Sequence, residues 1–419
     1  MYILHPDGSR TLDGSSGAAV SCLGHGHSVV IEAIINQART MAFAHTSFFT
    51  SDPAEKLAQL LIQQSNNAFT KVMFLSSGSE AIESAIKLAR QYHVSRGDAG
   101  RINFICRQYA YHGNTLGALS AGWNPARRQT FEPILSSAFH HVSPCFYSRG
   151  GKGQTEAEYV DHLIQEHEDM FDTLGPSSVA AILIEPISGS TLGAVPAAQG
   201  YLARLRQLCD KHGALLIFDE VMCGMGRAGT LHAWQSLGNV APDLQTIGKG
   251  LAAGYQPISA ILVSGKIHQA MQSSQGPPFL SGHTYQGHAI GCAAALATQE
   301  TFVRDDLLAN VTAMGELLQR ELEARVPLLK EVRGVGLFKA VDFATQFGKG
   351  IAAEVASTCL KNGLAVYLCS SAVDAILFAP PFIINEQEVE ELVSIFVRST
   401  KEVLQSRRME IEDQPSARI

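Results

Sequence analysis

A lysine and an aspartate follow two apolar runs in this chain, and together they could bind one cofactor. Asp219 closes the run Ala214–Phe218, and Lys249 comes 30 residues later (249 − 219), after the run that begins at Leu244. If both runs are buried strands, both side chains face one crevice of an α/β sheet, where such sheets bind ligands. A lysine amine reacts with an aldehyde, and a carboxylate pairs with a protonated ring nitrogen; pyridoxal phosphate carries both partner groups. The pair therefore favours this cofactor, although a lone lysine is more often a solvated surface residue.

Two other segments carry small or aromatic polar residues where a strand pattern ends. Ser77, Gly78 and Ser79 precede a helical pattern, so their backbone N–H groups and hydroxyls could bind an anion, or could simply cap the helix. Tyr111 and His112 could lie flat against a cofactor ring, or could belong to an ordinary packed turn. Each segment is ambiguous alone, and their position after successive strands is what favours a common site.

Two further patterns suggest other cofactors, and we reject both. Gly224–Gly229 spells the G-x-G-x-x-G dinucleotide fingerprint. Its first glycine is separated from the strand, Thr230–Trp234 would make a poor phosphate-binding helix, and the strand ends in an acid that would face the pyrophosphate. The histidines show no H-E-x-x-H or His/Cys spacing, so we expect no metal site.

Composition restricts the class of protein. The chain has 419 residues, of which 46% are hydrophobic and 17% charged, and a net charge of −7, which argues against nucleic acid as a partner. The 8 cysteines form no C-x-x-C pair, and we see neither a secretory signal nor an apolar run long enough for a membrane helix. We expect a cytoplasmic protein. The ending Ala417-Arg418-Ile419 loosely matches a peroxisomal address, and peroxisomal targeting is the alternative.

Strand and helix patterns alternate along the first 290 residues or so, which predicts an α/β fold with a mainly parallel sheet. The expected strands are Lys71–Leu75, Ile102–Cys106, Val179–Glu185 and Ala214–Asp219, and the expected helices run from Glu80 to Val94 and from Gln199 to His212. A long helical stretch from His288 to Val326 then leads to short strands around Val335–Phe343 and Leu364–Tyr367 and a last helix after Asn385. We expect an N-terminal arm (1–45), a large domain (46–299) and a small domain (300–419) that includes part of the arm.

In their order along almost the whole chain, these segments resemble the class III aminotransferases, the omega or ornithine-type group of fold-type-I pyridoxal phosphate enzymes. The matching segments are Leu12–Gly17, Leu23–His27, Ser77–Ala81, Tyr111–Gly113, Glu185–Pro186, Leu215–Val221, Gly226–Arg227, Pro242–Gly250, His283–Tyr285 and Arg333–Leu337. The resemblance implies a large domain with a mainly parallel seven-stranded sheet and a smaller α+β domain built from both termini. It also implies a homodimer with sites at the interface.

The resemblance also implies roles for the matching residues. Lys249 would carry the Schiff base and move the proton, and Asp219 would pair with the pyridine nitrogen. The other residues that it places around the cofactor are Ser77, Gly78 and Ser79 at the phosphate, Tyr111 and Val221 on the two ring faces, His112, Glu185 and Met222 nearby, and Thr284 reaching the neighbouring subunit's phosphate. The reaction would move an amino group from an amine or amino acid to a keto acid or aldehyde.

Two departures from the family pattern bear on the substrate. Ser190 stands where ornithine- and aminobutyrate-type members have a glutamate. Tyr367 lies near the place of the mobile arginine of amine–pyruvate members, and no Arg or Lys occurs from Tyr367 to Pro380. A guanidinium is the usual clamp for a carboxylate, so either Arg227 replaces it or the substrate is a hydrophobic amine. Phe49, in the aromatic segment Phe43–Thr50, is expected to line the entrance, or else to pack in the core.

Three interpretations remain open from the sequence. The first is a transaminase. The second keeps the cofactor but changes the reaction to that of an amino-acid epimerase, aminomutase, decarboxylase or phospho-lyase, which the same fold hosts. The third is an interaction protein without catalysis, which the presence of both Lys249 and Asp219 disfavours.

Overall fold

A seven-stranded sheet forms the centre of the large part of the molecule. The computed structural model describes residues 1–273, 277–327, 329–344 and 348–412. The sheet has the order β3-β11-β10-β9-β6-β4-β5, and only β11 runs against the others. Its strands are β3 (Phe69–Leu75), β4 (Asn103–Arg107), β5 (Phe139–Val142), β6 (Val179–Ile184), β9 (Leu215–Asp219), β10 (Leu244–Ile247) and β11 (Ser259–Ser264). The expectation of a mainly parallel seven-stranded sheet is confirmed.

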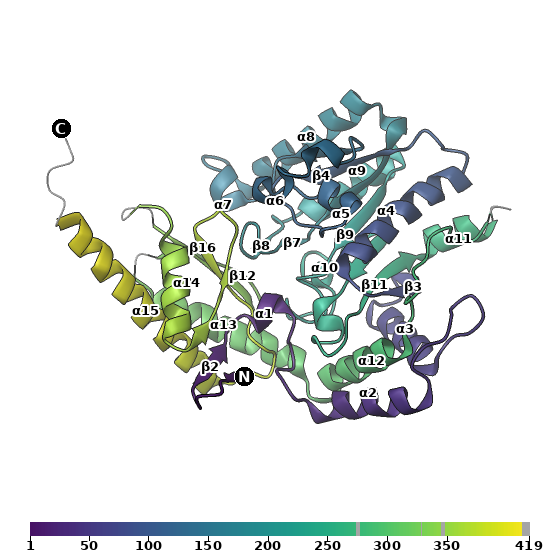
Figure 1. The fold of residues 1–419 in the computed structure, drawn as a ribbon. Helices are drawn as coiled ribbons and strands as arrows, with labels where there is room; N and C mark the ends of the chain where they lie inside the picture. Colours follow the sequence, from purple (N-terminus) through teal and green to yellow (C-terminus); the bar gives the residue numbers. More distant parts are fainter. Residues whose placement is uncertain (274–276, 328, 345–347, 413–419) are drawn as a thin grey trace.

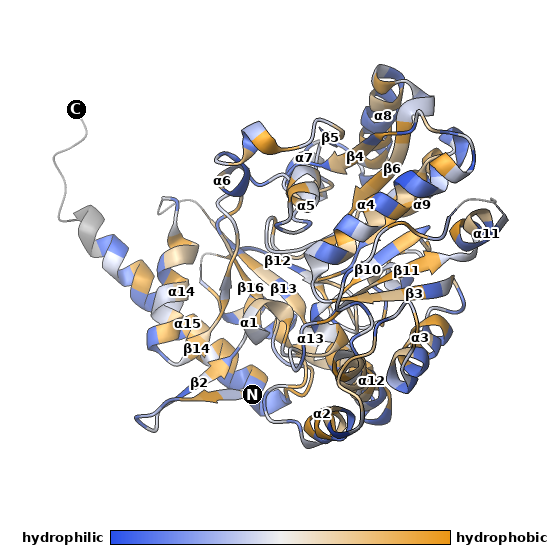
Figure 2. Ribbon diagram, turned by 45° about the vertical axis from the view of Figure 1, so that its right-hand side comes forward, coloured by the Kyte–Doolittle hydropathy of each residue, from blue (hydrophilic) through white to orange (hydrophobic). Residues whose placement is uncertain are grey.

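The central strands carry apolar residues on both faces. This pattern buries the sheet, because a parallel sheet is covered by helices on both sides. On β9, Leu215 and Ile217 pack in one cluster with α4 (Gly78–Ser95), whereas Leu216 and Phe218 pack in a second cluster with α8 (Glu156–Leu174) and α9 (Tyr201–His212). Figure 2 shows the apolar strands between helices with polar outer surfaces. The central strands and the two expected helices therefore form where the pattern predicts them.

Shorter elements complete this part of the molecule. They are α3 (Asp52–Gln64), α5 (Leu116–Ala121), α6 (Pro125–Arg128), η1 (Glu132–Ile134), α7 (Tyr147–Gly150), η2 (Pro176–Ser178), β7 (Ile187–Ser188), β8 (Val195–Pro196), α10 (Ala233–Ser236), η3 (Lys249–Leu251) and α11 (Gly265–Ser273).

A smaller part combines the two ends of the chain. Strands β1 (Tyr2–Leu4) and β2 (Arg10–Asp13) form a sheet with β14 (Leu364–Ala365), and Leu12 pairs with Leu364. A second sheet contains β12 (Leu329–Val335), β13 (Phe338–Phe343), β16 (Ala375–Phe378) and β15 (Tyr367–Leu368), with α14 (Ile351–Lys361) and α15 (Glu386–Glu412) packed around it. Figure 1 shows the purple N-terminal strand β2 beside the yellow C-terminal helix α15. A smaller α+β domain built from both termini is thus confirmed as an architecture.

The exact domain limits stay a prediction, and two helices bear on them. Helix α2 (Ser28–Thr40), within the expected arm, packs against α12 (Ala289–Arg304), and α12 itself spans the expected limit at 299/300. The expected helical stretch from His288 to Val326 is two helices, α12 and α13 (Leu307–Arg325). They are separated at Asp306, which has a left-handed φ of 48° that a continuing helix does not allow.

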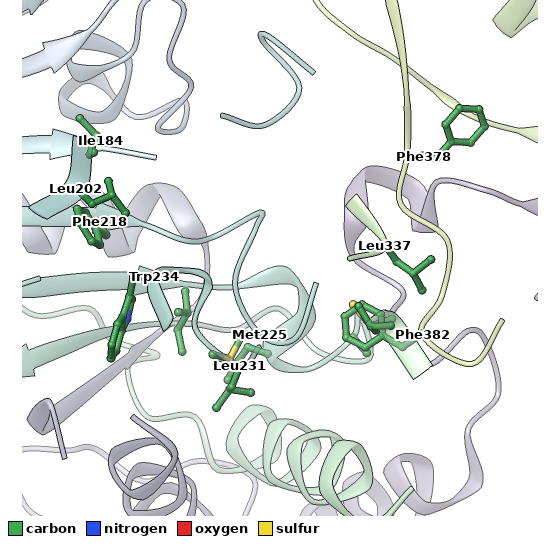
Figure 3. Close-up of a cluster of buried hydrophobic side chains, with 14 of the residues drawn as sticks. Ile184, Leu202, Phe218, Met225, Leu231, Trp234, Leu337, Phe378 and Phe382 are labelled. Atoms are coloured by element: carbon green, nitrogen blue, oxygen red, sulfur yellow. The ribbon is translucent and has the colours of Figure 1, made fainter. Parts of the chain in front are cut away.

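Hydrophobic contacts hold the two parts together next to the glycine-rich loop 224–229. Figure 3 shows Met225 and Leu231 from this region with Leu337 and Phe382 from the C-terminal part. All four side chains belong to one buried cluster, which also contains Phe218 of the central strand β9. The loop that resembles a dinucleotide fingerprint is therefore a packing element between the two parts.

Candidate active site

The carboxyl ends of the parallel strands meet around a cavity of about 410 Å³. It lies where α/β sheets bind ligands, because loops diverge there at the end of each strand. The expected site residues that line it are Ser77, Gly78, Ser79, Tyr111, His112, Glu185, Asp219, Val221, Met222 and Lys249. They come from the loops that follow β3, β4, β6, β9 and β10, so the fold brings together segments spread over more than 170 residues (249 − 77).

Asp219 is a buried carboxylate held by three donors. Its Oδ2 accepts a hydrogen bond from Nδ1 of His112 at 2.8 Å. Its Oδ1 accepts from the backbone N–H of Val221 at 3.1 Å and from the Thr246 hydroxyl at 3.2 Å. Because an ionised carboxylate only accepts hydrogen bonds, Nδ1 of His112 is the nitrogen that carries the proton. The buried Nε2 of the same ring has no hydrogen-bond partner among the described residues. The carboxylate is thereby fixed in orientation at the cavity wall.

Lys249 begins the short helix η3 in a strained conformation. Its φ of 41° lies in the left-handed region, which residues with a Cβ seldom adopt and which is frequent at functional sites. Burial lowers the pKa of its amine below the ordinary value, and the nearby charges of Asp219 and Glu185 oppose this shift. Lowering this pKa increases the neutral fraction of the amine, which is the form able to accept a proton.

Glu185 supports the loops on either side of the cavity. Its carboxylate accepts from the backbone N–H of Tyr111 at 3.3 Å and of Gly189 at 3.0 Å. Burial raises the pKa of this carboxyl, and the neighbouring carboxylate of Asp219 adds to the shift. Glu185 therefore shapes the cavity through the backbone of two loops.

The loop from β3 to α4 forms an anion-binding corner. Ser77 caps α4, since its Oγ accepts from the backbone N–H of Glu80 at 3.2 Å. An 18-residue helix that begins at Gly78 presents free N–H groups and a positive dipole end to the cavity. A Cβ on Gly78 would lie 2.8 Å from Cγ1 of Val221, so a larger residue there would displace the Val221 side chain from the cavity wall. Ser79 accepts from the backbone N–H of Asn114 at 3.0 Å, which joins this corner to the loop that carries Tyr111 and His112.

These residues fit pyridoxal phosphate on three grounds. The amine of Lys249 and the fixed carboxylate of Asp219 face one cavity, which suits an aldehyde and a ring nitrogen. The helix N-terminus with its two serines suits a phosphate. Tyr111 and Val221 both line the cavity, as contacts with two ring faces require.

Four expected site residues lie elsewhere. Thr284 and Phe49 are on the surface, and the Phe49 side chain is 67% exposed. Tyr367 lines a neighbouring hollow that also contains Tyr111 and Ser190.

Arg227 is fully buried and does not line the cavity, contrary to its expected place beside a substrate. Its guanidinium donates to the carbonyls of Leu337 and Pro380 and to Sγ of Cys22. The sequence around Arg227 does not show that these distant groups surround its guanidinium.

The sequence reasoning also missed residues that the structure places at the site. Thr246 holds Asp219, and Arg127 lies with its guanidinium carbon 4.9 Å from the centroid of the Tyr111 ring. Thr246 pairs with Asp219 across the neighbouring parallel strands β10 and β9. A prediction of strand pairing could therefore have found Thr246. No sequence signal distinguishes Arg127 from Arg128.

In the described part of the chain, no helix has the length and hydropathy needed to cross a membrane. Among these residues, no group of three or more His, Cys, Asp or Glu side chains is arranged so that it could hold a metal ion.

The fold and the site define a pyridoxal-phosphate-dependent enzyme of fold type I. The family model "Aminotransferase class-III" matches residues 1–399, and the chain belongs to this family. An uncharacterised aminotransferase of Schizosaccharomyces pombe is 38% identical, with 94% of this chain and 89% of the relative covered. An omega-aminotransferase of Caulobacter vibrioides is 34% identical, with 95% and 91% covered.

Solved structures agree with this assignment. An (S)-enantioselective omega-transaminase from Thermomicrobium roseum superposes with a TM-score of 0.90 and 33% identity, covering 96% of this chain and 91% of that one. An amine transaminase from an uncultivated Pseudomonas species, in its PLP-bound form, gives 0.90 and 31%, with 96% and 93% covered. The protein is thus a transaminase that uses pyridoxal phosphate, and an interaction protein without catalysis is excluded. Transamination is also favoured over the epimerase, aminomutase, decarboxylase and phospho-lyase reactions.

Proposed function

We propose that Lys249 binds the cofactor and moves the proton while the enzyme transfers an amino group from an amine or amino acid to a keto acid or aldehyde. The observation that carries this assignment is the shared cavity, which a half-buried lysine of lowered pKa lines together with a fixed aspartate. When bound, pyridoxal phosphate supplies an aldehyde that exchanges amines and a ring that withdraws electrons from a breaking C–H bond.

The residues of the chain perform the remaining steps. Nζ of Lys249, in its neutral form, takes a proton from the donor carbon on one side of the transferred nitrogen. It then returns the proton to the carbon on the other side of that nitrogen. Asp219, oriented by His112, stabilises positive charge at the ring nitrogen. Ser77, Gly78 and Ser79 hold the phosphate, and Tyr111 and Val221 fix the plane of the ring.

A homodimer is the second part of this proposal. Large apolar side chains lie exposed in the two segments that carry Phe49 and Thr284: Phe48 is 78% exposed, Leu280 74% and Tyr285 60%. Exposed apolar side chains of this size favour a protein interface. We place Thr284 and Phe49 of one subunit at the cavity of the other. Light scattering of the purified enzyme, with a monomer as the contradicting result, measures the assembly.

Cytoplasmic localisation is the third part, with the peroxisome as its alternative. All 8 cysteines are unpaired, as expected in a reducing compartment. The ending Ala417–Ile419 lies outside the described residues. Imaging of the full chain in cells, with and without its last three residues, separates the two compartments.

The decisive experiment is a visible absorbance spectrum of the purified enzyme, with Lys249→Ala as the test variant. We expect the wild-type band to bleach with a donor amine and to return with a keto acid. Lys249→Ala should lose this cycle and about 100- to 10,000-fold in turnover, the range for removing a general base. Lys401→Ala, on the exposed surface of α15, is the matched control. Unchanged turnover in Lys249→Ala would refute the assignment.

A further inference from the structure

A second hollow of about 330 Å³ adjoins the cofactor cavity. The two share Tyr111 and Ser190, so a substrate bound at Lys249 could extend from one into the other. The walls of the second hollow come from α6 and from β15 with the loop after it, and they include Arg127 and Tyr367. This hollow therefore lies between the large part of the molecule and the C-terminal part.

Arg127 is the cation of this second hollow. Its guanidinium carbon lies 4.9 Å from the centroid of the Tyr111 ring, and because Tyr111 lines both hollows this cation–π contact holds a positive charge beside the residue that they share. No carboxylate in the described part of the chain forms an ion pair with it, and its side chain is exposed. The adjacent Arg128, by contrast, is buried and bound to Glu132 and to the carbonyls of Ser120 and Gly122. Of the two, Arg127 is the one with its donors available to a ligand.

Other cations are poorly placed for a substrate carboxylate. Among the described residues that line the two hollows, the only lysine or arginine side chains are Lys249 and Arg127. The donors of Arg227 point to interior carbonyls, and the segment from Tyr367 to Pro380 contains no Arg or Lys. Arginine is the side chain best suited to a carboxylate, because it offers two parallel N–H donors.

We propose that Arg127 binds the carboxylate of keto-acid and amino-acid substrates at the junction of the two hollows, with Ser190 and Tyr367 supplying hydroxyls. This inference rests on the proposed function and names its substrate class.

Paired acceptors test the role of Arg127. We compare 2-oxobutyrate with propanal, which lacks only its carboxylate, using one amine donor. Arg127→Met should raise KM for 2-oxobutyrate at least about 10-fold and leave KM for propanal within about two-fold, because a charge-assisted pair is lost for one acceptor only. Arg127→Lys should fall between, since it keeps the charge without the two-pronged geometry. Arg320→Met, on the exposed face of α13, is the control.

A binding measurement makes the test independent of turnover. We titrate the holoenzyme calorimetrically with glutarate, a dicarboxylate without an amino or keto group, and expect about 10-fold weaker binding in Arg127→Met but not in Arg320→Met. Equal KM changes for both acceptors, no change for either, or unchanged glutarate binding in Arg127→Met would overturn the proposal. Failure of the wild type to use either acceptor would instead refute the proposed function, and the glutarate titration would still report on Arg127.

Discussion

His112 shows how one residue acts through another. It lies 107 positions from Asp219, and its Nδ1 is 2.8 Å from Oδ2 of that carboxylate. The imidazole is buried, so solvent cannot replace this hydrogen bond if the ring is removed. We therefore treat His112 as a positioning residue for Asp219.

Replacing His112 tests this role. His112→Phe keeps a flat ring but loses the donor, and we expect kcat to fall about 10- to 100-fold, as for other supports of a reacting group. His112→Asn should recover part of the loss, because its amide can donate from a similar position. A merely structural role would lower stability equally in both variants and leave the pH dependence of the visible cofactor band unchanged. That band and kcat are the two measurements.

At the scale of elements, Arg227 connects the loop after β9 to the C-terminal part. Its donors reach the carbonyls of Leu337 at 3.1 Å and Pro380 at 2.5 Å, and its guanidinium lies 4.5 Å from the Phe382 ring centroid. Leu337 and Phe382 are neighbours in the core shown in Figure 3. The arrangement joins three segments through one side chain.

Arg227→Met should therefore affect stability and spare substrate affinity. Two buried carbonyls would lose their donor, at a cost of about 1–3 kcal/mol each in the free energy of unfolding. Urea unfolding measures this loss, and KM for 2-oxobutyrate should stay near the wild-type value. A raised KM with unchanged stability would contradict the structure and restore Arg227 as a substrate ligand.

For the whole molecule, buried histidines make stability depend on pH. Burial lowers the pKa of His93 and His167 to about 4 and that of His232 to about 3, below the ordinary value of 6.5. Between about pH 6.5 and 4 the unfolded chain binds protons that the folded chain does not. The contribution of these neutral histidines to folding stability is therefore fully present above about pH 6.5. It decreases as the pH falls, by up to about 1.4 kcal/mol per pH unit for each histidine.

The measurement is urea unfolding at pH 7, 6 and 5. We expect the midpoint to fall with pH in the wild type and to fall less steeply in His167→Leu, which removes one buried group that acid must charge. His162→Leu is the control, because the His162 side chain is 60% exposed. Equal slopes in all three proteins would show that His167 does not contribute.

The sequence by itself predicted features that depend on local patterns. Apolar runs placed the strands around Asp219, and the stripe of Ile82, Ala85 and Ile86 placed α4, because periodicity and burial are recorded in neighbouring residues. The pair of Lys249 and Asp219 favoured pyridoxal phosphate, and a family resemblance then named the reaction. The break at Asp306 was not predicted, since the apolar pattern continues across it.

Only the tertiary structure decided which distant groups touch. It buried Arg227 among carbonyls, placed His112 on Asp219, and left Arg127 over Tyr111 at the edge of a second hollow. None of these contacts is local, because each depends on strand order and on how the C-terminal part packs against the sheet. A side chain's charge and length are fixed by sequence, whereas the partner it meets is set by the fold.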